Sequence, residues 1–292
     1  MSELASRVAL VCDEAARTIP DPVLADEAGA LGGRLAGPLR VAFAGRVKAG
    51  KSTLLNALVG ERMAPTDAGE CTRIVTWYRE GPGYEVHALL RDRSLRPLGF
   101  RRDATALDID LSGLAAESIE RLDVQWPSSR LHELTLIDTP GLASVHGATS
   151  ARTEQFLALE GERSTDADAV VYLMRHVHRR DVEFLDAFMD RSIAHASPLH
   201  AVGVLSRADE IGGGRLDAIH SAARIAGRYE QDPELRSLCS TIVPVAGLLA
   251  ETGTTLREVE FQALRTLAAA PNDVLDVMLV TVDRFTEPSL GP

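Results

Sequence analysis

The sequence is poor in cysteine and has no long apolar run. Its three cysteines, Cys12, Cys71 and Cys239, lie far apart and lack the short spacing of metal ligands. They indicate small thiols in a reducing compartment rather than a disulfide framework. No stretch reaches the roughly 20 apolar residues of a membrane span, and the acidic N-terminus lacks the apolar core of a signal peptide. We therefore expect a cytoplasmic protein whose membrane contact, if any, is peripheral, at the inner face of the plasma membrane.

Net positive charge is also missing. The 292 residues carry a formal charge of −11, and the isoelectric point is about 5.2. This balance argues against a general nucleic-acid binder, because phosphate backbones attract basic surfaces. A hydrophobic content of 45% in a chain of this length suits one large α/β domain with a helical appendage, or two small domains.

The most informative segment is a glycine-rich loop over residues 45–52. It reads GRVKAGKS and fits the pattern G-x-x-x-x-G-K-[ST]. An apolar run, Leu39 to Ala44, precedes it, and the helical stretch Thr53 to Leu58 follows. A strand, a loop and a helix in this order let backbone N–H groups and the helix N-terminus surround a polyphosphate. The residues predicted to bind it are Arg46, Val47, Lys48, Ala49, Gly50, Lys51, Ser52 and Thr53.

A second motif, D-T-P-G at residues 138–141, closes an apolar strand. In P-loop enzymes an acid at such a strand end holds Mg²⁺ through water, and we expect the glycine amide to bond the γ-phosphate. A threonine ligand for Mg²⁺ should lie between the P-loop helix and the second strand. Thr72 is preferred over Thr66, because it directly precedes that strand. The predicted metal site is Ser52, Thr72 and, through water, Asp138, with Gly141 as the phosphate sensor.

A third motif, residues 206–209, follows an apolar strand and reads S-R-A-D. G-proteins have [NT]-K-x-D at this place, where the aspartate accepts hydrogen bonds from guanine N1 and N2. Here Asp209 keeps that role, and the planar guanidinium of Arg207 can stack on the base. An ordinary polar strand end is the alternative. Ala246 and Gly247 occupy the place of a further loop, whose alanine amide contacts guanine O6.

Apolar strands alternate with helices along most of the chain. This alternation predicts an α/β fold with a mainly parallel sheet and helices on both faces. Together with the three motifs, it indicates a P-loop NTPase G domain. The expected strands cover residues 39–44, 73–78, 84–90, 96–102, 131–137, 169–174, 201–205 and 241–245, and the expected helices 53–58, 154–159, 182–189 and 216–229. Helical segments over 1–37 and 255–292 should flank the nucleotide-binding domain over 38–254, and they can pair into a neck.

Taken together, these motifs resemble the bacterial dynamin-like GTPases. The resemblance rests on residues 45–58, on Pro65-Thr66 with Cys71-Thr72, on residues 138–141, and on residues 243–250, which are similar to actinobacterial members of the isoniazid-inducible type. It implies a GTPase head with GTP or GDP and Mg²⁺ as its ligands, and a role in membrane remodelling. It also implies pairing of heads, either as a homodimer or with a paralogous dynamin-like partner. The family's helical stalk and membrane-contacting tip have no room in this chain, so we expect them to be absent here.

The sequence departs from the family at the residues that place the attacking water. Eukaryotic dynamins have Gln two residues after the first P-loop glycine, where this chain has Val47, and the small G-protein Gln is replaced by Leu142. Lys48 can supply a cation in cis, as an arginine finger does in part. The predicted catalytic residues are therefore Lys48, Lys51, Thr72 and Gly141.

Two other interpretations stay open at this point. One is an Era-type ribosome-associated GTPase, which shares D-T-P-G, and the other is a nucleotide-dependent dimerisation module that scarcely turns over. Two further groups are noted. His176 and His178 favour a polar loop at the nucleotide edge over a metal site, because a third ligand is not evident. The arginines between 91 and 102 give a hairpin a basic face, with solvated arginines as the default interpretation.

Overall fold

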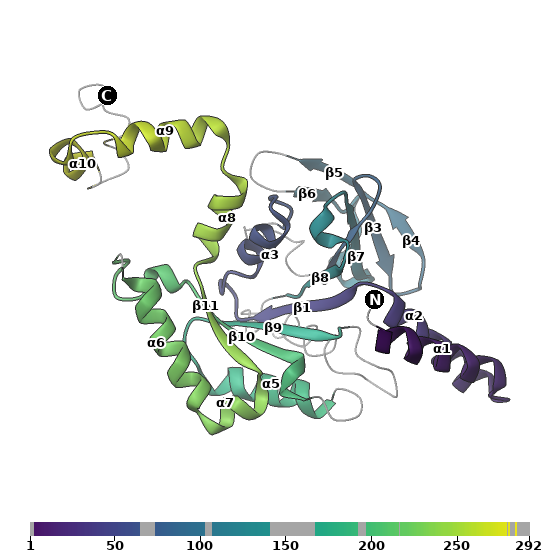
Figure 1. The fold of residues 1–292 in the computed structure, drawn as a ribbon. Helices are drawn as coiled ribbons and strands as arrows, with labels where there is room; N and C mark the ends of the chain where they lie inside the picture. The colour runs from purple at the N-terminus through teal and green to yellow at the C-terminus, as the bar shows by residue number, and fades with distance from the viewer. Residues whose placement is uncertain are drawn as a thin grey trace.

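The structure, a computed structural model, describes residues 3–64, 74–102, 107–140, 167–191, 197–215 and 217–278, together with residues 280 and 284. A nine-stranded sheet forms its centre (Figure 1). The strands are β1 Leu39–Gly45, β2 Thr76–Glu80, β3 Glu85–Leu90, β4 Leu95–Pro97, β5 Gly99–Arg102, β6 Leu107–Asp110, β7 Ile119–Trp126, β8 Leu134–Asp138, β9 Ala169–Met174, β10 Ala201–Ser206 and β11 Thr241–Val245. In the sheet they follow the order β11-β10-β9-β1-β8-β2-β7-β3-β4, while β5 and β6 form a separate two-stranded ribbon.

Five neighbouring strands, from β11 to β8, are all parallel to one another. They are apolar along most of their length, as expected for strands with both faces covered. Their carboxyl ends meet at one edge of the sheet, which is where open α/β sheets bind ligands. This half of the sheet confirms the predicted P-loop arrangement.

The other half of the sheet is mixed. β2 runs antiparallel to β8 and parallel to β7, and β3 and β4 continue the sheet in antiparallel pairs. The prediction of a single strand over 96–102 is wrong. The chain turns out of the sheet at Leu98, whose amide donates to the Val86 carbonyl at 2.8 Å, and then enters the ribbon with β6. Strands β6 and β7 are also missing from the sequence-based prediction, which therefore underestimated the antiparallel part.

Helices cover both faces of the sheet, as predicted. The helices are α1 Glu3–Thr18, α2 Pro22–Ala36, α3 Lys51–Val59, α5 Arg179–Arg191, α6 Ala218–Gln231, α7 Pro233–Leu238, α8 Gly247–Thr255, α9 Glu258–Ala268 and α10 Asn272–Met278, with 3-10 helices η2 Ala116–Ser118, η3 Ser129–Leu131, η4 Pro198–His200 and η5 Ala208–Glu210. Alternate residues of β1 enter two separate cores. Phe43 packs in the core that includes Leu55 of α3, whereas Ala42 packs in the core beneath α5, α6 and α7. The helix predicted over 154–159 lies outside the described residues.

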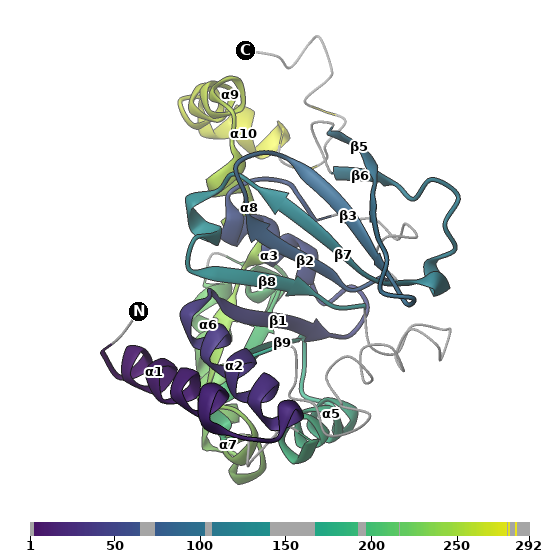
Figure 2. The same cartoon turned by 90° about the vertical axis from the view of Figure 1, so that its right-hand side faces the viewer.

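The N-terminal helices α1 and α2 pack along each other as a hairpin. Asp21 caps α2 by accepting from the Val23 amide at 2.9 Å, and Pro22 is the first helical residue. The hairpin is tied to the sheet by an ion pair of 2.8 Å between Arg34 and Asp168, the residue before β9. Figures 1 and 2 place this hairpin on the opposite side of the molecule from α9 and α10, so the described helices of the two ends do not pair in this arrangement. Among the described helices, none has the length and apolar character needed to cross a membrane.

Candidate functional site

The glycine-rich loop joins β1 to α3 at the carboxyl edge of the sheet. Gly45 has a φ of 146°, and a Cβ atom there would lie 2.4 Å from the Leu173 carbonyl oxygen. Only glycine therefore lets β1 pass this close to β9. At the other end of the loop, Gly50 adopts the left-handed conformation with a φ of 95° and caps α3. The two glycines thus fix a tight loop in front of a helix N-terminus.

Lys51 is the first residue of α3 and points back into this loop. Its side chain is only 9% exposed, and its ammonium donates to the Gly45 carbonyl oxygen at 3.4 Å. Burial lowers the pKa of the Lys51 ammonium, and the nearby Asp138 carboxylate partly offsets that shift. A buried cation with so little compensation favours an anionic ligand within the loop.

Asp138 stands at the end of β8, opposite the start of α3. The Ser52 hydroxyl donates to its Oδ2 at 3.4 Å, while its buried Oδ1 has no hydrogen-bond partner among the described residues. Burial raises the pKa of Asp138 to about 6, against the opposing effects of Lys51 and Ser52. A hydroxyl beside an unsatisfied carboxylate oxygen is the donor set that Mg²⁺ prefers. These residues fit the predicted metal site.

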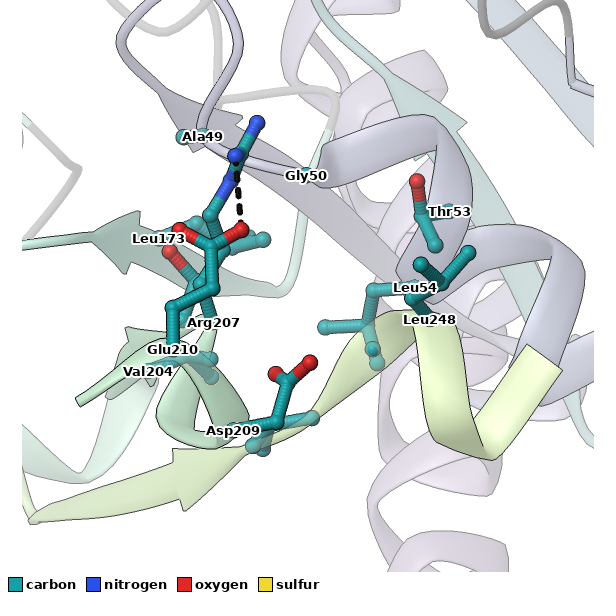
Figure 3. A pocket seen from close by; sticks show the side chains of 13 residues that line it. Ala49, Gly50, Thr53, Leu54, Leu173, Val204, Arg207, Asp209, Glu210 and Leu248 are labelled. Carbon is teal, nitrogen blue, oxygen red and sulfur yellow. Dashed lines mark hydrogen bonds and ion pairs between the residues drawn. The ribbon is translucent and has the colours of Figure 1, made fainter. Parts of the chain in front are cut away.

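A pocket of about 240 Å³ opens beside the loop, between β10, η5 and the start of α8 (Figure 3). Its lining residues are Ala49, Gly50, Thr53, Leu54, Leu173, Val204, Ser206, Arg207, Asp209, Glu210, Val245, Gly247 and Leu248. Figure 3 shows the Asp209 carboxylate facing the space in front of Leu54 and Leu248. Glu210 is paired with Arg175 and Arg207, so Asp209 is the lining carboxylate that faces this space. An apolar slot with such a carboxylate can hold a planar ring that carries hydrogen-bond donors.

Arg207 links this pocket to the phosphate-binding loop. It has a φ of 54°, and its guanidinium donates to the Lys48 carbonyl oxygen at 3.2 Å. Lys48 itself has a φ of 63°, which presents that carbonyl to Arg207. The two predicted subsites therefore lie side by side, and one ligand can occupy both.

Comparison with known proteins places the chain in a family. The sequence model of the Dynamin family matches residues 41–190, which hold the glycine-rich loop and the D-T-P-G motif. The chain belongs to the dynamin family. This dynamin-family chain is 44% identical over 255 residues to the isoniazid-induced protein IniC of Mycobacterium tuberculosis, covering 87% of this chain and 51% of that protein. It is 30% identical over 150 residues to a bacterial dynamin-like protein of Nostoc punctiforme, covering 48% of this chain and 20% of the relative.

Two solved structures share the fold of this dynamin-family chain. Both come from an oligomerised bacterial dynamin pair, with TM-scores of 0.53 and 0.54 at 17% and 15% identity. The matched regions include 94% and 97% of this chain, but only 42% and 47% of the chains in the two solved structures. The chain thus spans about half the length of IniC and of the two solved structures. The family match favours the dynamin-like interpretation over the Era-type alternative.

Sequence reasoning missed several residues of the site in this dynamin-family chain. Glu210 pairs with Arg207 at 2.9 Å and with Arg175 at 2.7 Å, so it holds two arginines at once. Leu248 and Leu54 supply apolar walls of the pocket. One local signal could have indicated that Glu210 pairs with Arg207. Glu210 follows Arg207 by three residues and is next to Asp209.

Other predicted residues fall elsewhere. Thr66, Thr72, Gly141 and Leu142 lie outside the described residues. Ala246 caps α8 and is not itself in the pocket lining, although Gly247 is. Val47, within the glycine-rich loop, is 47% exposed. His176 and His178 face each other edge-on at 6.3 Å, and no group of three metal-ligating side chains is found in the part of the chain that the structure describes.

The basic hairpin is largely engaged within the protein. Arg102 pairs with Glu61 at 2.7 Å and lies over the Trp126 ring, and Arg93 pairs with Glu120 at 3.3 Å. Arg91 donates to the Glu117 carbonyl at 2.8 Å. These contacts favour a structural role for these three arginines, rather than the solvated face that was the default interpretation.

Proposed function

We propose that this dynamin-family chain binds guanine nucleotides with Mg²⁺ and hydrolyses GTP to GDP and phosphate. The observation that carries the proposal is the Arg207–Lys48 contact of 3.2 Å. Through this contact the apolar pocket that contains Asp209 lies directly beside the glycine-rich loop that contains the buried ammonium of Lys51. A nucleotide has the same sequence of groups, a donor-bearing ring followed by a polyphosphate.

The loop would hold the phosphates through the backbone amides of residues 46–53 and the α3 N-terminus. Lys51 would neutralise the β- and γ-phosphates, and the Gly141 amide would contact the γ-phosphate. Ser52 and Thr72 would ligate Mg²⁺, with Asp138 holding it through water. When bound, the ion would neutralise charge that develops on the phosphate oxygens.

The base would be selected by Asp209. Its carboxylate can accept hydrogen bonds from guanine N1–H and N2–H, a donor pair that adenine lacks. Arg207 would stack on the base with its planar guanidinium, and Ala246 and Gly247 would complete the rim. Leu54 and Leu248 would cover the ring with apolar surface.

Hydrolysis requires water to attack the γ-phosphorus while the bond to the β–γ bridging oxygen breaks. Val47 has no group that can orient this water. We therefore assign catalysis chiefly to charge stabilisation by Lys51 and Lys48, with water placed by backbone groups or by a second head. The second head would be another copy or a paralogous dynamin-like chain. A slow, nucleotide-dependent dimerisation module is the second candidate, and Val47 is the observation that favours it.

A membrane role is also part of the proposal. The solved bacterial dynamin pair is described as sensing and tethering membranes. For this chain we propose a cytoplasmic GTPase head over 38–254, with helical neck segments over 1–37 and 255–292. Contact with the inner face of the membrane would come through segments other than those described.

Calorimetry with GDP, GTP and ATP tests the proposal. We expect guanine nucleotides to bind in the presence of Mg²⁺, ATP to bind far more weakly, and Lys51→Ala to abolish binding. Equal affinity for GTP and ATP would point to an ATPase instead. Phosphate release measured against protein concentration separates the two candidates, because rates that rise as heads associate indicate an enzyme and a flat, near-zero rate indicates the dimerisation module.

A further inference from the structure

A second pocket lies beside the glycine-rich loop, at the carboxyl end of β9. Its volume is about 430 Å³. Its lining residues are Arg46, Val47, Ala49, Leu173, Met174, Arg175, His176 and His178. It shares Ala49 and Leu173 with the base pocket, so the two pockets adjoin the same stretch of the loop. The proposed GTPase function uses the backbone amides of Arg46, Val47 and Ala49 but assigns no role to the side chains of Arg46, Arg175, His176 and His178.

Nitrogen-bearing side chains dominate this second pocket. Arg46, His176 and His178 have no side-chain hydrogen bond or ion pair with any other described residue. Arg175 is partly neutralised by Glu210, which it shares with Arg207. The nearby Asp181 carboxylate is occupied, since it accepts from the Tyr172 hydroxyl at 2.7 Å and the His178 amide at 2.9 Å. The pocket therefore holds positive charge and donors that the described part of the protein does not compensate.

This charge distribution excludes a metal ion and favours an anion. Two guanidinium groups would repel a cation, and their planar donor forks match the oxygens of a phosphate. The volume falls within the range of small-molecule sites. We propose that this pocket binds a phosphate-bearing small molecule, at a site separate from that of the nucleotide.

Inorganic phosphate is the probe for this proposal, with acetate as the carboxylate comparison. The full chain is titrated in two forms, the parent saturated with GDP and Mg²⁺, and the Lys51→Ala variant without nucleotide. The ring resonances of His176 and His178 report binding by NMR. We expect phosphate to shift both in each form, and acetate to bind several-fold more weakly. Binding in the Lys51→Ala form keeps this test independent of the nucleotide proposal.

Variants locate the site. The double substitution His176→Gln with His178→Gln, followed through the ¹⁵N side-chain signals of the arginines, should weaken phosphate binding about tenfold, which corresponds to about 1.4 kcal/mol. Arg179→Gln is the matched control, because Arg179 is next in sequence but pairs with Glu183 and lies outside the lining. Glu210→Gln should tighten binding several-fold by releasing Arg175, a gain that misfolding cannot imitate. No shift at tens of millimolar phosphate, loss of binding on GDP addition, or equal weakening by Arg179→Gln would overturn the proposal.

Discussion

Asn56 on the P-loop helix and Glu251 on α8 are joined by a buried hydrogen bond of 3.3 Å from Asn56 Nδ2 to Glu251 Oε1. The Asn56 side chain is fully buried, and its Oδ1 also accepts from the amides of Met63 and Ala64 at 2.9 Å and 2.7 Å. One amide group thus connects three segments. These are the helix that would hold the phosphates, the segment Met63–Ala64 that follows it, and the helix that continues from the base pocket toward α9.

Replacing Asn56 should destabilise the protein strongly. Asn56→Ala removes the partner of both the Ala64 amide and the Ala64 carbonyl, and a buried group left unsatisfied costs about 1–3 kcal/mol. It also weakens the contacts of two other groups, because the Met63 amide keeps the Glu61 carbonyl at 3.1 Å and Glu251 keeps its ion pair with Arg62 at 3.5 Å. We expect a total loss of about 2–5 kcal/mol in the free energy of unfolding, measured by urea denaturation. Gln262→Ala on the exposed face of α9 is the control and should stay within about 0.5 kcal/mol. A near-neutral Asn56→Ala would show that this network is not formed.

The Asp138 carboxyl should make the metal-free protein less stable as the pH rises. Its pKa is about 6 in the folded state, against 3.8 for a free side chain. The folded state therefore binds more protons at Asp138 between these values. The contribution of this carboxyl to the free energy of unfolding is fully present below about pH 4 and is lost as the pH rises through 6. Asp138→Asn removes this titration. Relative to the parent, the variant should gain about 2 kcal/mol between pH 4.5 and pH 7.5.

Urea denaturation in a chelating buffer at these two pH values measures that difference. Other carboxyl groups titrate in both proteins, so their contributions cancel in the comparison. Addition of Mg²⁺ should stabilise the parent more at pH 7.5 than at pH 4.5, because the ion requires the ionised carboxylate. If the free energies of unfolding of parent and variant differ by the same amount across the pH range, Asp138 does not have a raised pKa in the folded state.

Which of these features were predictable depends on how far apart in sequence the contacts are. The glycine-rich loop was predictable because its glycines, Lys51 and Ser52 lie within eight consecutive residues whose local geometry is fixed. Asn56 and Glu251 are 195 residues apart, and nothing near either residue indicates the other. Strand β7 did carry an alternating apolar signal in its second half, but its place between β2 and β3 depends on long-range pairing that periodicity does not specify.

Lysine chemistry offers a direct test of ligand binding. The sequence contains two lysines, Lys48 and Lys51, and both lie in the loop. An amine-selective acylating reagent therefore modifies these two lysines and the N-terminal amine. With GDP and Mg²⁺ at a hundred times the dissociation constant, labelling of Lys51 should fall about tenfold or more, because the free fraction is small. Peptide mass spectrometry reads out each site.

The N-terminal amine is the internal control for this labelling, and its modification should not change. Protection by GDP but not by ADP would support guanine selectivity. Equal labelling of Lys51 with and without nucleotide would show that the loop does not enclose the phosphates.

Base selection by Asp209 can be inverted rather than merely removed. Asp209→Asn replaces an acceptor by an amide donor that faces the N1–H and N2–H groups of guanine. GDP affinity should fall about 10²-fold, since hydrogen bonds to charged groups contribute about 1.5–3 kcal/mol each. Xanthine has a carbonyl at C2, so the variant should bind xanthosine diphosphate more tightly than the parent does.

Asp217→Asn, an exposed residue paired with Arg215 outside the pocket, is the matched control. Unchanged GDP affinity in both variants would mean that the base is read by other groups, whereas a loss without the xanthosine gain would mean that Asp209 shapes the pocket without touching the ring.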